Sequence, residues 1–279
     1  GKTLNMSMLE QFFSLEYANR GDLFQGLAIW QEKSSNGEIS LGEENLPPAE
    51  SPLERDYKYR KLQGTYPVIS LSFANVKETS FSDARKKICQ IIKEIYNKND
   101  FLLKSKCLNE DEEESFRKVS VEMEDYLATG SLNALSNYLS RYYGKKVIIL
   151  LDEYDTPMQE AYVNGYRKEL VGFIRSLFNA TFKTNPYLDR AIMTGITRIS
   201  KESLFSDLNN LEVVTTTSDK YADSFGFTEE EVFAALVECG LGDRKADVKD
   251  WYDGFVFGGK RNIYNPWSIL NFLNKGKLA

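Results

Sequence analysis

The chain has 279 residues, of which 42% are hydrophobic and 27% are charged, and its net charge is −6. This composition can bury a core, which excludes a disordered chain, and the acidic balance gives no sign of a duplex-binding surface. No apolar run approaches the roughly 18 residues of a membrane span. The sequence contains no histidine, which excludes Ser-His-Asp and Cys-His catalysis. Any chemistry must therefore use carboxylates, Lys, Arg, hydroxyls and a metal bound by oxygen.

Hydrophobic periodicity predicts helices and strands that alternate along the chain. Residues 147–151 are continuously apolar, which indicates a strand covered on both faces, as in a parallel sheet. Thr228 and Glu231 form a capping-box pattern, with Phe227 and Val232 placed as a hydrophobic staple at the start of a helix. The order predicts an α/β fold with a mostly parallel sheet flanked by helices. In chain order we predict a helix over 3–15, a long excursion over 32–64, a strand over 66–76, a helix over 81–95, an acidic solvated surface over 108–114, a helix over 132–142 ended by Gly144, a strand over 147–151, a helix over 170–178, strands over 190–197 and 211–217, a helix over 228–240 and a last helix from Asn265.

The first three residues are Gly1, Lys2 and Thr3, and a helical pattern follows them directly. In a phosphate-binding loop that ends in Gly-Lys-Thr, backbone N–H groups and the helix N-terminus surround the phosphates. The Lys reaches the β- and γ-phosphates, and the Thr hydroxyl binds Mg²⁺. The tripeptide alone is weak evidence, because the first Gly of such a loop would lie upstream of Gly1. Its interpretation as a nucleotide site depends on a second motif.

That second motif is VIILLDEYD, in which an apolar strand ends in Asp152 and Glu153. Open α/β sheets bind ligands at the carboxyl ends of their strands. There Asp152 can hold Mg²⁺, and Glu153 can accept a proton from the water that attacks a metal-bound triphosphate. Acidic residues that simply end a strand at the surface are the alternative. Because both motifs occur in the required order and on the required elements, we expect the chain to bind a nucleotide and Mg²⁺.

Further candidates lie near these strand ends. Thr194 stands where a hydroxyl could touch the γ-phosphate or the attacking water, and a hydroxyl bonded to the backbone is the alternative. Arg198 could neutralise developing charge as an arginine finger, and a surface ion pair is the alternative. We interpret Asp155 as the cap of the next helix rather than as a residue that binds a water near the metal.

Five long motifs occur in a fixed order along the chain: GKTLNMSMLEQFF, KKVIILLDEYDTPMQEA, MTGITRISKESLFSDLNNL, KYADSFGFTEEEV and WYDGFVFGGKRNIYNPWSILNFL. In this order they resemble the bacterial AAA-ATPase-like family, a P-loop NTPase domain often followed by a PD-(D/E)XK nuclease-like domain. The resemblance implies that Lys2 and Thr3 end the Walker A motif and that Asp152 and Glu153 form the Walker B motif. It carries over Thr194 and Arg198 less directly.

The resemblance also implies the additional-strand, catalytic-Glu type of P-loop fold, in which the strand that ends near Thr194 lies between the Walker A and Walker B strands. We expect the chain to be a fragment that starts inside Walker A, with the first strand absent and weak affinity for ATP. The expected domains are a truncated NTPase core over 1–218 and a helical, lid-like segment over 219–279. Residues 251–254 (WYDG) and 264–267 (YNPW) are interpreted as a buried aromatic corner.

Three functions are compatible with these residues. The leading one is Mg²⁺-dependent ATP binding and hydrolysis that serves as a conformational switch. The second is a nucleotide-sensing or interaction module without turnover. The third is a metal-dependent nuclease built on Asp152, Glu153 and Asp155, which the sequence disfavours because no Lys stands in an ExK arrangement beside them. We expect a cytoplasmic protein with reduced cysteines, and a nuclease-like domain or protein partner outside this chain.

Overall fold

The computed structural model describes residues 1–31, 57–196, 211–252 and 254–278. The chain divides into two compact units, a larger one of Met6–Asn210 and a smaller one of Gly1–Asn5 together with Leu211–Ala279. None of the helices in the described ranges combines the length and the apolarity needed to cross a membrane. The helices and strands are α1 (Lys2–Phe13), α2 (Ala28–Gln31), β1 (Val68–Ser72), α3 (Phe81–Lys98), α4 (Glu110–Lys118), α5 (Asp125–Tyr143), β2 (Val147–Asp152), α6 (Thr156–Asn164), α7 (Arg167–Phe178), β3 (Leu188–Met193), α8 (Glu229–Glu238), α9 (Lys245–Tyr252), β4 (Phe255–Phe257), β5 (Lys260–Ile263) and α10 (Pro266–Lys275).

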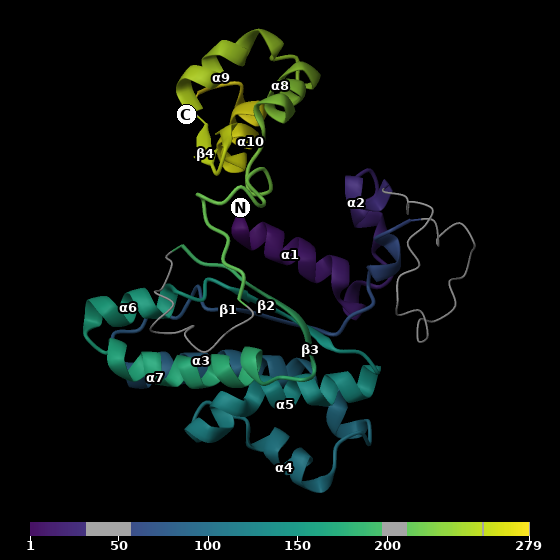
Figure 1. The fold of residues 1–279 in the computed structure, drawn as a ribbon, viewed down its shortest axis with the longest axis vertical. Coiled ribbons are helices and arrows are strands. Elements are labelled where there is room, and N and C mark those ends of the chain that lie inside the picture. The colour runs from purple at the N-terminus through teal and green to yellow at the C-terminus, as the bar shows by residue number, and fades with distance from the viewer. Residues whose placement is uncertain (32–56, 197–210, 253, 279) are drawn as a thin grey trace. The chain divides into compact units, whose positions relative to one another are not determined.

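The larger unit is built on a three-stranded parallel sheet in the order β1-β2-β3. All six residues of β2 are buried, as its continuously apolar sequence predicts for a central strand. The register pairs Ser72 with Asp152 and Leu151 with Met193, so the three strands end at one edge of the sheet. Figure 1 shows this sheet with α1 along one face and α3, α5 and α7 along the other. A mixed α/β fold with a parallel sheet flanked by helices is therefore confirmed.

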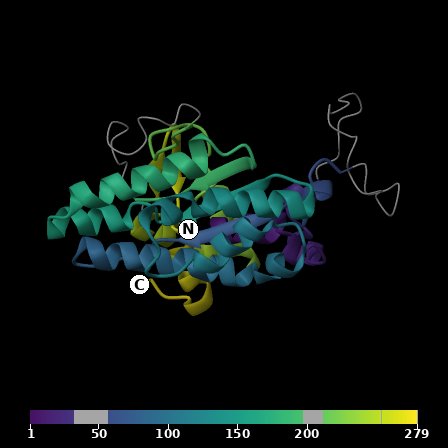
Figure 2. The same ribbon diagram turned by 90° about the horizontal axis from the view of Figure 1, so that it is seen from below.

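The helical layer packs through apolar stripes that the sequence shows at helical spacing. Figure 2, which is viewed from below, shows the long helices of this layer side by side in front of the sheet. The Ser80 hydroxyl accepts a hydrogen bond from the backbone N–H of Asp83 at 3.2 Å and so caps α3. Gly144 ends α5 with a φ of 64°, in the left-handed region that glycine adopts without strain. The fully buried side chains of this layer include Ile88, Ile92, Leu135, Leu170, Ile174 and Leu177.

Helix α1 covers the opposite face of the sheet. Met6 forms a small apolar cluster with Ile148 and Leu150 of β2. The carboxylate of Glu10 accepts a hydrogen bond of 2.9 Å from the hydroxyl of Ser70 on β1. These contacts fix the face of α1 that lies against the sheet, and they confirm the helix predicted over residues 3–15.

Strand β3 forms an edge of the sheet in the part of the chain that the structure describes. Its central residues Arg190, Ala191 and Ile192 are exposed. The prediction of a further strand over 211–217 is wrong, because those residues form a loop and a turn. The carbonyl of Thr215 accepts from the backbone N–H of Ser218 at 3.0 Å, which closes that turn. β-branched residues favour a strand only where another strand pairs with their backbone groups.

The smaller unit contains α8, α9, α10 and a two-stranded antiparallel hairpin of β4 and β5. The predicted capping box is present: the Thr228 hydroxyl accepts from the backbone N–H of Glu231, and the Glu231 carboxylate accepts from that of Thr228. The aromatic corner is only partly as predicted, since Tyr264 is buried but the side chains of Trp251 and Trp267 are largely exposed. The core of this unit consists of Val232, Leu236, Val248, Tyr264, Ile269 and Phe272.

Candidate functional site

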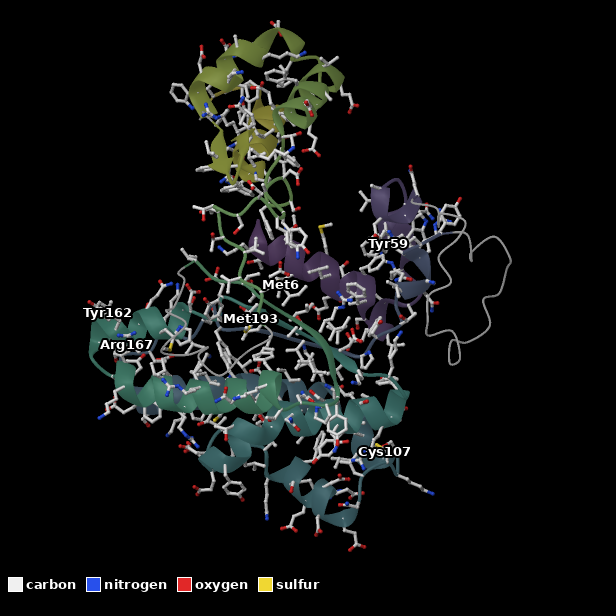
Figure 3. The ribbon with its side chains drawn as sticks, in the orientation of Figure 1. Met6, Tyr59, Cys107, Tyr162, Arg167 and Met193 are labelled. Atoms are coloured by element: carbon white, nitrogen blue, oxygen red, sulfur yellow. The ribbon has the colours of Figure 1, made fainter. Side chains whose placement is uncertain are left out.

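The carboxyl ends of β1, β2 and β3 bring polar residues to one edge of the sheet, which is where open α/β sheets bind their ligands. Met193, labelled in Figure 3, is the last residue of β3, and Thr194 follows it. The backbone N–H of Thr194 donates to the carbonyl of Leu151 at 2.9 Å, so pairing with β2 continues for one residue past the strand. Thr194 therefore lies beside the end of β2.

Asp152 is the last residue of β2 and is buried. Its Oδ1 accepts a short hydrogen bond from the hydroxyl of Thr194. Thr194 was expected to touch a phosphate or an attacking water, or to bond to the backbone. In the structure its hydroxyl instead orients the carboxylate that the sequence assigns to the metal. A buried carboxylate needs such a donor, because burial of an unpaired charge is costly.

Glu153 takes a left-handed conformation with a φ of 55°, which is uncommon for a residue other than glycine. The carbonyl of Thr194 accepts from the N–H of Tyr154 at 3.0 Å, while the N–H of Thr194 donates to Leu151. In a regular pair of parallel strands, the N–H and the C=O of one residue bond to two residues of the adjacent strand, and these two residues are two positions apart in the sequence. Here they are three positions apart, so Glu153 is the extra residue of a bulge, a feature that re-aims side chains next to functional sites.

The Glu153 carboxylate lies beside the start of α6. Its Oε2 accepts a hydrogen bond of 3.0 Å from the hydroxyl of Thr156. The side chain is half-buried rather than enclosed. A carboxylate that is oriented by one hydroxyl and still reaches solvent can accept a proton from a water molecule, which is the chemistry that the sequence predicts for it.

Asp155 stands at the N-cap position of α6, but its side chain makes no capping hydrogen bond. The predicted side-chain cap is therefore wrong. A capping residue normally has an extended backbone, whereas Asp155 already has helical dihedrals of −93° and −12°. Its Oδ2 accepts instead from the backbone N–H of Ile196 and from the Nε2 of Gln159, both at 3.0 Å. Asp155 is fully buried and links α6 to the segment that follows β3.

Of the phosphate-loop candidates, Lys2 and Thr3 begin α1 and Gly1 precedes it. The carbonyl of Gly1 accepts from the N–H of Asn5 at 3.2 Å. They are grouped with the smaller unit, whereas the strand-end residues belong to the larger one. The structure thus brings together Asp152, Glu153 and Thr194. Arg198 lies outside the described residues.

The donor set at the strand ends suits Mg²⁺ that is shared with a nucleotide. Magnesium prefers oxygen ligands, and in nucleotide sites it is held by one or two protein groups, the phosphates and water. Asp152 supplies a buried carboxylate. The metal-binding role of the Thr3 hydroxyl stays a prediction from the sequence. In the described ranges no three His, Cys, Asp or Glu residues are grouped as a metal site. The nuclease alternative built on Asp152, Glu153 and Asp155 stays a hypothesis that the sequence disfavours, because no Lys stands in an ExK arrangement beside these residues.

Two residues of this edge are not among the sequence-predicted candidates. Ser72 ends β1 directly opposite Asp152, and a polar residue at the end of an apolar strand was the available signal. Gly195 follows Thr194, and a Cβ at this position would come within 2.5 Å of Asp155 Oδ1. A surface hollow of about 370 Å³ lies elsewhere in the larger unit, and its lining residues include none of the strand-end candidates. They are Phe81, Asp125, Tyr126, Thr129, Glu169, Gly172, Phe173 and Ser176.

Comparison with known proteins identifies the class to which this fold and this site belong. Residues 1–205 match the AAA-ATPase-like family, described as "Predicted AAA-ATPase", and the chain belongs to that family. It is also similar to a protein of Azotobacter chroococcum mcd 1 described as "Uncharacterized protein in vnfD 5'region", with 30% identity over 133 residues. That match covers 47% of this chain and 25% of the relative. No solved structure matches the chain.

Proposed function

We propose that the chain is an ATP-binding and ATP-hydrolysing domain that depends on Mg²⁺ and acts as a conformational switch. Membership of the AAA-ATPase-like family supports the class of reaction. The observation that carries the proposal is the carboxylate of Asp152, buried at the end of the central strand and hydrogen-bonded by Thr194, with Glu153 next to it on a bulge.

In the proposed reaction, some residues bind the metal and the nucleotide, and one residue transfers a proton. As the sequence motifs predict, Asp152 and the hydroxyl of Thr3 would hold the metal, and the Nζ of Lys2 would contact the phosphates beside the N–H groups of the helix start. Magnesium, when bound, neutralises phosphate charge. Glu153 accepts the proton of the attacking water on its carboxylate.

Two groups support these residues in the proposed reaction. Thr194 fixes the rotamer of Asp152 through its hydroxyl. Arg198, which the sequence places after β3, is the candidate for neutralising the charge that develops on the phosphates. Its role stays a prediction from the sequence.

We infer the additional-strand, catalytic-Glu type of P-loop sheet for this domain. β3 lies directly beside β2 and has no second neighbouring strand along its other edge among the described residues. Its central residues are also exposed, including Ile192, of which 38% is exposed. A strand that leads into a phosphate loop would pair with this edge in the additional-strand order. The lid-like role of residues 219–279 likewise stays a prediction.

Replacement of the proposed general base tests the reaction. In the full-length protein, Glu153→Gln keeps the shape of the side chain and removes its basicity. We expect phosphate release to fall by roughly 10²–10⁴-fold, the usual contribution of general base catalysis, while Mg-ATP binding survives. The matched control is Glu94→Gln, which changes an exposed carboxylate on α3 and should leave turnover unchanged. Unchanged phosphate release in Glu153→Gln would show that another group positions the water.

A nucleotide-sensing module without turnover is the second candidate. It is favoured by the hydrogen bond between Glu153 and Thr156, which occupies one oxygen of the proposed base. In this alternative the nucleotide orders the strand ends, and no proton is transferred. Phosphate release in the wild-type protein separates the two: Mg-ATP binding with negligible release would support the sensing module.

A further inference from the structure

Asp155 is a fully buried carboxylate that the proposed reaction does not use directly. Its Oδ2 accepts from the backbone N–H of Ile196, two residues after Thr194, and from the side chain of Gln159 on α6. The first of these bonds joins segments 41 residues apart in the sequence. The carboxylate therefore ties the turn after β2 to the segment after β3.

The backbone at Gly195 approaches this carboxylate more closely than any other residue type would allow. A Cβ there would lie 2.5 Å from Asp155 Oδ1 and 2.8 Å from the ring of Tyr154. Contacts below 3.0 Å are essentially never seen for a Cβ atom. The segment after β3 thus lies directly on the side chain of Asp155, and any larger residue at position 195 would force the side chain of Asp155 or Tyr154 to shift.

Thr194 and Glu153 lie between Asp152 and the contact of Asp155 with Ile196. Thr194, whose hydroxyl bonds to Asp152, is held on one side by Leu151 and on the other by Tyr154. Glu153 sits inside this loop of hydrogen bonds as the extra, left-handed residue. A strained conformation persists only where the surrounding structure determines it. After the two backbone hydrogen bonds of Thr194, the next contact between these two segments is the hydrogen bond from the Ile196 N–H to Asp155.

We propose that Asp155 is a positioning residue: by clamping Ile196 over Gly195, it sets Glu153 and Thr194 at fixed positions relative to each other. The inference rests on the proposed function for its effect on turnover, but the clamp itself is a property of the protein without nucleotide. Loss of the clamp should let the bulge relax and let Thr194 leave Asp152. The consequence is a misplaced general base rather than a lost binding group.

The test combines turnover with amide hydrogen exchange in the full-length protein. Asp155→Ala removes both acceptors, whereas Asp155→Asn keeps one oxygen that can still accept from the Ile196 N–H. In Asp155→Ala we expect kcat to fall by on the order of 10–10²-fold with little change in KM, since about 1 Å of misplacement costs that much. Asp155→Asn should recover part of the loss. Asp189→Asn, which alters an exposed carboxylate on β3, is the matched control.

Hydrogen exchange separates this inference from the proposed function. Without nucleotide, the amides of Tyr154 and Ile196 should exchange roughly tenfold faster in Asp155→Ala, in line with the loss of one buried hydrogen bond, while α3 is unaffected. Equal exchange in variant and wild type, or a rise spread evenly over α3 and the strand ends, would overturn the clamp. Absence of phosphate release from the wild type would overturn the proposed function, and the exchange rates would still decide whether Asp155 clamps the strand ends.

Discussion

At the scale of single residues, the sequence located the acidic strand end but not its partners. Asp152 and Glu153 could be predicted because a buried apolar strand that ends in two carboxylates is visible in the sequence. The hydrogen bond from Thr194 to Asp152 and the left-handed Glu153 could not, because both depend on the register between strands 42 residues apart. A bulge of one residue decides where each side chain points.

The phosphate-binding role of Lys2 gives a prediction at this scale. Lys2→Ala removes a charge-assisted contact to the phosphates worth about 1.5–3 kcal/mol, so Mg-ATP should bind roughly tenfold to a hundredfold more weakly. Calorimetric titration of the full-length protein measures the affinity. Lys275→Ala, which removes an exposed ammonium group from the end of α10, is the control. Equal affinity in Lys2→Ala and the control would refute the phosphate-loop assignment.

At the scale of elements, local patterns predicted the long helices and the buried strand. They failed where the formation of a strand depends on pairing with another strand. Residues 211–217 are rich in β-branched side chains yet form a loop and a turn, since a strand needs a neighbour for its backbone groups. The acidic segment predicted as solvated surface is largely exposed, as at Glu110, Asp111 and Glu114. It also contributes to a helix that was not predicted, α4, which starts with a capping box at Asn109 and Glu112. The hairpin of β4 and β5 was missed because strands of three and four residues carry little periodicity.

Glu229, the first residue of α8, joins three elements of the smaller unit. Its carboxylate pairs with Lys249 on α9 at 2.9 Å and accepts hydrogen bonds from Asn262 on β5 at 3.3 Å and from the hydroxyl of Tyr264 at 3.2 Å. The hydrogen bond from Lys249 is the main cause that lowers the pKa of Glu229. The ionised carboxylate is therefore bound more favourably in the folded unit than in the unfolded chain.

The lowered pKa predicts a pH-dependent contribution to stability. The contribution is complete above the pKa of an unfolded Glu, about 4.3, and is lost as the pH falls through the lower folded pKa. At pH 7 the variant Glu229→Gln should be less stable by about 1 kcal/mol, and the difference should shrink as the carboxylate becomes protonated. Urea unfolding across this pH range measures it, with Glu230→Gln as the exposed neighbour control. If the difference in the free energy of unfolding between Glu229→Gln and the wild type does not change with pH, ionisation of Glu229 is not its source.

At the scale of the whole molecule, the chain combines a sheet-based unit with a smaller unit that has a core of its own. The family match covers residues 1–205, which leaves the described residues of the smaller unit from Leu211 onward outside it. The parallel sheet follows from the sequence because buried strands and amphipathic helices alternate. The domain boundary expected between residues 218 and 219 stays a prediction, and the grouping of Gly1–Asn5 with Leu211–Ala279 depends on long-range contacts that no local sequence pattern marks.

Nucleotide binding should appear as a change in the stability of the whole molecule. A ligand that binds only the folded state adds about 2.7 kcal/mol to the free energy of unfolding at a concentration 100 times its Kd. Thermal melting of the full-length protein should therefore shift upward with Mg-ATP. Glu153→Gln should keep this shift, because it removes proton transfer and not binding, whereas Asp152→Asn should lose its dependence on Mg²⁺. If the melting shift of Asp152→Asn depends on Mg²⁺ as strongly as that of the wild type, Asp152 does not hold the metal, and the strand-end site would then need another donor.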